Sequence, residues 1–202
     1  DVVAVMCHDE RAEITQWLRS LSATADDEHA IRRKVVRARG EHEAEEALTA
    51  LWEVEDPRER IRPAEELAAA HPDDARITYE LAGTHDAAGE EDLAVALYER
   101  ALAAGLREPH RHRAQIQLAS SLRNLGQVQA AESVIEDVAA RHPESLGVAA
   151  FRALVQHDAG HASQALADLL TAVVAASTDP DVARYRRALT ASASALRKHP
   201  QG

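Results

Sequence analysis

The chain has 202 residues, of which 46% are hydrophobic, and it carries a formal net charge of -11. This hydrophobic content excludes a disordered chain, and the single cysteine, Cys7, excludes an internal disulfide framework. No apolar run approaches the roughly 20 residues of a membrane span, and the acidic balance argues against binding along a nucleic-acid backbone. Because the Ala-rich composition favours helix over sheet, we expect an all-α protein whose partner is neither a membrane nor a nucleic acid.

Two details bear on origin and location. Lysine occurs twice against 21 arginines, a bias that indicates a GC-rich bacterial genome. The sole methionine is Met6, which is either the initiator or an internal residue of a longer protein. Residues 1–5 are too short and too poor in basic residues for a signal peptide, so the cytoplasm is the expected location.

Residues 1–40 are expected to form an N-terminal helical extension. An amphipathic helix is predicted over 9–22, because apolar residues recur at helical spacing, namely Ile14, Trp17, Leu18 and Leu21. A second helical stretch covers 28–54, and its basic side chains between Arg32 and Arg39 are interpreted as a solvated face. Gly40 lies in the middle of this stretch. An interior glycine costs about 1 kcal/mol relative to alanine, which favours a break there over one continuous helix.

The next helix has a clear start. Asp56 stands in the capping position, Pro57 follows in the first turn, and Glu59 lies three residues after the cap. Pro63 is expected to kink or restart this helix, because proline lacks the backbone N–H that an interior position requires.

From residue 73 onward the chain repeats. Gly89, Gly126 and Gly160 each separate two helix-length segments, at intervals of 37 and 34 residues. An alanine follows each glycine after five residues, at a place where two antiparallel helices would cross closely and only a small side chain fits. These alanines are Ala94, Ala131 and Ala165.

The pattern resembles the tetratricopeptide repeat, a 34-residue helix–turn–helix unit. Three units fall within 73–178, and 41–72 resembles a degenerate unit in which Arg60 and Leu67 stand where small residues are expected. The resemblance implies a right-handed α–α superhelix, or solenoid. A helix within 179–202, starting at Asp179, is expected to cap its C-terminal end with a basic outer side.

The sequence offers little for chemistry. His157 and His161 have a metal-pair spacing, but Gly160 interrupts their helix face, and His110 and His112 lie among arginines that disfavour a cation. Cys7 has only its sequence neighbour His8 as a base, and no phosphate loop or nucleophile elbow is present. We therefore predict no enzyme activity, no catalytic residue, no metal and no cofactor.

The resemblance also implies a function. In this family the first helices of successive units line a concave groove that receives a peptide. Ten residues match inward-facing places of the family: Arg76, Tyr79, Asp86, Arg113, Ile116, Ser120, Arg123, Asn124, Leu154 and His157. Arginine forks suit carboxylates, so a non-enzymatic module that binds an acidic peptide or protein segment is predicted.

Several alternatives stay open. The chain is alternatively a regulatory or sensor domain of a longer protein, or a scaffold that forms a homo-oligomer through its end faces or through helix 9–22. The N-terminal helices either cap the solenoid or fill its groove. Arg123 and Asn124 either face the groove or cap the end of their own helix.

Overall fold

The computed structural model describes residues 25–198, which hold nine α-helices and no β-strand. The chain divides into two compact units, residues 1–49 and 50–202. The helices in chain order are α2 (Ala25–Glu53), α3 (Pro57–Ala70), α4 (Ala75–Ala87), α5 (Glu91–Ala103), α6 (His110–Asn124), α7 (Val128–Arg141), α8 (Leu146–Asp158), α9 (Ala162–Ala176) and α10 (Pro180–Lys198). None of these helices is long and apolar enough to cross a membrane.

The predicted break at Gly40 is wrong, because α2 continues through this residue without interruption. One interior glycine costs about 1 kcal/mol, whereas a break leaves four carbonyls and four N–H groups without helical partners. The exposed side chains of Arg32 and Arg33 agree with the solvated face expected there. The helix predicted over 9–22 lies outside the described residues.

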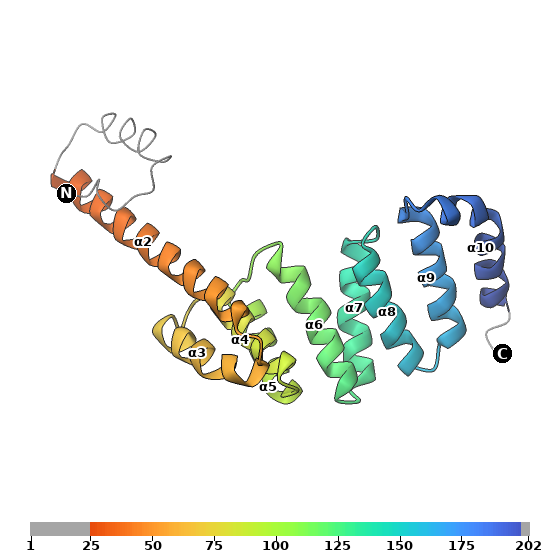
Figure 1. Cartoon of the computed structure of the whole chain (residues 1–202), viewed down its shortest axis with the longest axis horizontal. Helices are drawn as coiled ribbons and strands as arrows, with labels where there is room; N and C mark the ends of the chain where they lie inside the picture. Colours follow the sequence, from red (N-terminus) through yellow and green to blue (C-terminus); the bar gives the residue numbers. More distant parts are fainter. Residues whose placement is uncertain (1–24, 199–202) are drawn as a thin grey trace. The chain divides into compact units, whose positions relative to one another are not determined.

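Within residues 50–202 the helices stack in chain order. Each helix from α3 onward packs against the next one (Figure 1), and the helices form antiparallel pairs joined by short turns. The first helices of three pairs, α4, α6 and α8, also contact one another in succession. This second set of contacts places α4, α6 and α8 next to one another.

Three of the turns share one glycine geometry. Gly89, Gly126 and Gly160 have φ values of 81°, 74° and 87°, a region that side chains other than glycine rarely adopt. The residue after each glycine donates its N–H to a carbonyl five residues earlier, as in Gln127 to Leu122 at 2.9 Å. This bond satisfies a carbonyl at the helix end that would otherwise have no partner.

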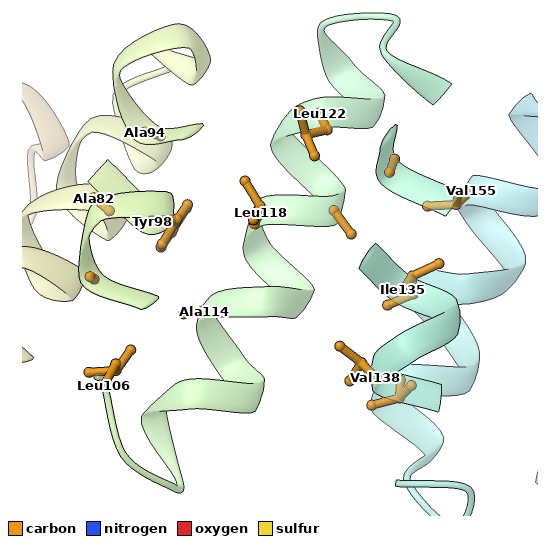
Figure 2. Packing of buried hydrophobic residues seen from close by; sticks show 14 residues of the cluster. Ala82, Ala94, Tyr98, Leu106, Ala114, Leu118, Leu122, Ile135, Val138 and Val155 are labelled. Atoms are coloured by element: carbon orange, nitrogen blue, oxygen red, sulfur yellow. The ribbon is translucent and has the colours of Figure 1, made fainter. Parts of the chain in front are cut away.

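A hydrophobic core runs from α4 to α8. Figure 2 shows α6, with Leu118 and Leu122, between Tyr98 of α5 and Ile135 of α7. Ala94 and Ala131 are fully buried and Ala165 is nearly so, as expected for places of close helix crossing. Of the described residues in α9 and α10, none belongs to this cluster. Those two helices bury mainly small side chains, which include Ala165, Ala167, Val174 and Ala193.

The turn before α3 has a different construction. Asp56 caps α3 by accepting the N–H of Arg58, and Pro57 is in the first turn, as predicted. The helix then continues through Pro63 and does not restart there. Arg60 occupies the place of the small residue, and its guanidinium reaches back to the carbonyl oxygens of Val54 and Glu55, at 2.6 and 3.1 Å.

The last helix begins as expected. The Asp179 carboxylate accepts the backbone N–H groups of Asp181 and Val182, which fixes the start of α10. α10 packs on α9, and most of its side chains are exposed. Arg197 lies at 3.0 Å from Asp168 of α9, so this arginine holds the two helices together.

Candidate functional site

The ten predicted groove residues lie on α4, α6 and α8. These helices contact one another in succession, and we call the ten predicted positions on them the first-helix surface. The side chains on this surface differ in what they already bind within the protein. Their internal partners decide which of them remain available to a ligand.

Arg76 is committed to internal contacts at the start of the surface. Its guanidinium lies at 2.8 Å from the Glu80 carboxylate and at 2.8 Å from the ring nitrogen Nε2 of His110 on α6. The other Glu80 oxygen accepts the indole N–H of Trp52 at 2.8 Å. Glu80 therefore ties the end of α2 to α4, and Arg76 ties α4 to α6.

Tyr79 lies half-buried between these groups. Its ring centroid is 6.1 Å from that of Tyr98 and 5.5 Å from that of His110. Burial raises the pKa of the Tyr79 hydroxyl, while the nearby charges of Arg113 and Arg76 lower it. Arg113 on α6 is thus close enough to Tyr79 on α4 to affect the pKa of its hydroxyl.

Asp86 joins two units. It accepts hydrogen bonds from the hydroxyls of Ser121 on α6 and Tyr98 on α5, at 2.8 and 3.3 Å. Burial raises the pKa of the Asp86 carboxyl, and these two hydrogen bonds act in the opposite direction. The carboxylate acts as a structural tie, and its oxygens are already occupied.

Arg123 makes the corresponding tie between α6 and α8. It lies at 2.9 Å from Asp158, and a second nitrogen donates to the amide oxygen of Asn124. Asp158 also accepts from His157 at 2.9 Å. The hydrogen bonds from His157 and then from Arg123 hold the pKa of Asp158 below its ordinary value. Both ties span 35 residues, which is close to one repeat.

The remaining predicted residues differ in exposure. Arg113 is exposed and has no ion-pair partner among the described residues, unlike Arg76 and Arg123. Ile116 and Ser120 are half-buried, and Leu154 exposes 47% of its surface. Of the three predicted arginines, Arg113 is therefore the one without an ion pair among the described residues, and apolar residues lie near it along the surface.

Sequence reasoning missed the partners of these residues. Ser121, not the predicted Ser120, binds Asp86, and the two serines differ only by one step around the helix. Trp52 and Glu80 were also missed, because Trp52 comes from the unit whose pattern is degenerate. No motif marks such ties, and only the 35-residue spacing of polar side chains could have indicated them.

A family model for the tetratricopeptide repeat matches residues 75–196. The chain belongs to the tetratricopeptide repeat family. A solved structure titled "MamA RS-1 ArsTM double mutant" is similar, with a TM-score of 0.57 and 16% sequence identity over 78% of this chain and 90% of that chain. No curated protein matches. Tetratricopeptide repeats generally mediate protein–protein interaction and are typically non-enzymatic, and the solenoid of helix pairs is the fold expected of them.

Proposed function

We propose that this tetratricopeptide solenoid is a non-enzymatic module of the bacterial cytoplasm that binds a peptide segment on the first-helix surface. The observation that carries the proposal is the contrast between Arg113 and the other two predicted arginines. Arg76 and Arg123 are paired with carboxylates of the protein itself. Arg113 is exposed near the middle of the surface, and its charge is not neutralised by an ion pair among the described residues.

Charge and exposure indicate the ligand. A guanidinium with free donors binds a carboxylate in a two-pronged arrangement, so an aspartate, a glutamate or a peptide C-terminus fits Arg113. Tyr79 and Ile116 lie partly exposed on the same surface, and Leu154 is about half exposed on the neighbouring helix. We therefore propose a peptide in which an acidic residue is flanked by apolar side chains.

A peptide-display selection on immobilised protein tests this proposal, with Arg113→Glu as the variant. The matched control is Arg111→Glu, which makes the same charge change on the same helix. Two residues along a helix are about 200° apart, so Arg111 points away from the first-helix surface. Both arginines are exposed, so neither change disturbs the core.

Wild type and Arg111→Glu are expected to enrich acidic–apolar peptides, with binding lost in Arg113→Glu by more than about tenfold, or about 1.4 kcal/mol. Enrichment of the same peptides by all three proteins moves the binding surface elsewhere. If no peptide is enriched and the mass from light scattering rises with concentration above 21.9 kDa, the result favours the homo-oligomeric scaffold.

A further inference from the structure

A cluster of metal-ligating side chains lies apart from the first-helix surface. Glu108, His112 and His142 each present one ligand atom, and these three atoms lie within 4.8 Å of one another. Glu108 precedes α6, His112 belongs to its first turn, and His142 ends α7. The cluster therefore connects the start of α6, the first helix of one unit, to the end of α7, the second helix of the same unit. We propose that Glu108, His112 and His142 form a Zn²⁺ site.

The three side chains already lie close together. The Glu108 carboxylate oxygen Oε2 lies at 2.9 Å from Nδ1 of His112, and the centroids of the His112 and His142 rings are 4.9 Å apart. Zn²⁺ binds nitrogen and oxygen at about 2.0–2.2 Å in a tetrahedron, which places ligand atoms roughly 3.3–3.5 Å apart. Side-chain rotation must bring the three ligand atoms, now within 4.8 Å of one another, to that spacing.

The chemistry of the set also suits zinc. Two imidazoles with one carboxylate are a common set of three protein ligands for Zn²⁺, and the fourth position is taken by water. Glu108 is anchored, because its Oε2 also accepts the backbone N–H of His112 at 3.3 Å. His112 and His142 are half-buried, so their rings are held by packing while the site stays open to ions from solvent.

The arginines that argued against a cation from the sequence are directed elsewhere. Arg111 and Arg113 flank His112, but successive residues on a helix point about 100° apart. Arg141 precedes His142, and its guanidinium is held by Asp137 at 2.5 Å and by Gln115 at 3.1 Å. The positive charge nearest to His142 in sequence is therefore offset by a carboxylate of its own helix.

Titration calorimetry with ZnCl₂ on tag-free protein tests the site. The matched control is His161→Ala, because His161 is an exposed histidine outside the cluster. Wild type and His161→Ala are expected to bind one Zn²⁺ per chain with equal affinity. We expect His112→Ala and His142→Ala each to weaken binding by more than about tenfold, and Glu108→Gln to weaken it as well. Equal isotherms for wild type and these three variants overturn the proposal, as does the lack of a one-to-one site in wild type.

A second measurement does not depend on the folding of a variant. Co²⁺ substitutes for Zn²⁺ and gives intense visible absorption when it is four-coordinate. Wild-type protein titrated with Co²⁺ is expected to develop these bands and to lose them when Zn²⁺ is added. The weak spectrum of octahedral, hydrated Co²⁺ throughout the titration overturns the proposal. Neither result bears on peptide binding, which is assigned to Arg113, because Arg113 and its neighbour His112 point about 100° apart around α6.

Discussion

The turn between α2 and α3 is built differently from the three glycine turns, which follow α4, α6 and α8. At each, a helix ends and the chain reverses, so carbonyls at the helix end need partners. The glycine turns supply these partners from the backbone, with glycine at positive φ. The turn between α2 and α3 has no glycine, and the Arg60 side chain donates to the carbonyls of Val54 and Glu55 within the turn itself. A side chain thus supplies hydrogen bonds in this turn, where the glycine turns use the backbone.

The position at which the repeat pattern has a small residue also differs. In the later helix pairs a buried alanine sits where the helices cross, whereas Arg60 of α3 directs its guanidinium over the Trp52 ring, 4.8 Å from its centroid. The following substitutions test these differences.

Ala131→Leu is expected to have the largest effect. Ala131 is fully buried where α6 and α7 cross, so the added side chain must push the helices apart. We expect a loss of about 2–3 kcal/mol in the free energy of unfolding, measured by urea denaturation. Ala130→Leu, an exposed change on the same helix, is the control and is expected to stay within about 0.5 kcal/mol of wild type. Equal stability of the two variants contradicts the role of the small residue.

Gly126→Ala should cost about 1–2 kcal/mol for a purely conformational reason. A Cβ at Gly126 meets no atom within 4 Å, so only its φ of 74° opposes a side chain. Gly147→Ala makes the same change inside α8, where the φ is not positive and the nearest atom, Ser145 Oγ, is 3.8 Å away. That variant should gain about 0.5 kcal/mol. Thermal unfolding of both proteins checks the opposite signs.

Arg60→Ala is expected to cost about 1 kcal/mol, because the carbonyls of Val54 and Glu55 in the turn after α2 lose their donor while water partly replaces it. Arg62→Ala is the matched control. Arg62 pairs with Glu66 at 3.6 Å with both side chains largely exposed, and such pairs contribute little. Urea denaturation of the two variants distinguishes a specific role of Arg60 from a general effect of charge. Equal losses would show that the first turn needs no such donor.

The smallest expected effects are on the pH dependence of stability, through Asp86 and Asp158, which link the first helices. The pKa values of these two carboxyl groups shift in opposite directions. The pKa of Asp158 is lowered, so its contribution to stability is present above its ordinary pKa of 3.8 and is lost as pH falls through the folded value. The pKa of Asp86 is raised, so its contribution is present below 3.8 and is lost as pH rises through the folded value. Carboxyl chemical shifts followed by NMR across this acid range should show Asp158 titrating below Asp86. The reverse order contradicts these assignments.

The regular part of the fold was predictable, because its signals are local. Gly89, Gly126 and Gly160 indicated the turns, and the alanine five residues after each indicated the crossings. The first pair was not predictable in the same way, since Arg60 breaks the pattern and its compensation depends on a turn in three dimensions. Gly40 was misjudged because propensity was weighed without the backbone groups that a break leaves unpaired.

The candidate site was predictable only in part, for a similar reason. Family positions indicated which residues lie on the first-helix surface. They could not show that Arg76 and Arg123 already bind carboxylates, because those partners lie on other turns or other helices. The approach of His142 to His112 was equally invisible, since thirty residues and a helix pair separate them.

The extent of the hydrophobic core has a consequence for how the molecule opens. The core runs from α4 to α8, and the described residues of α9 and α10 add only small buried groups beyond it. In a stack where each helix depends on its neighbours, the end with the least buried surface separates first. Amide protons of α10 should therefore exchange with solvent deuterium fastest, then those of α9, and those of α6 slowest. The C-terminal part of the stack would then open in graded steps, α10 before α9.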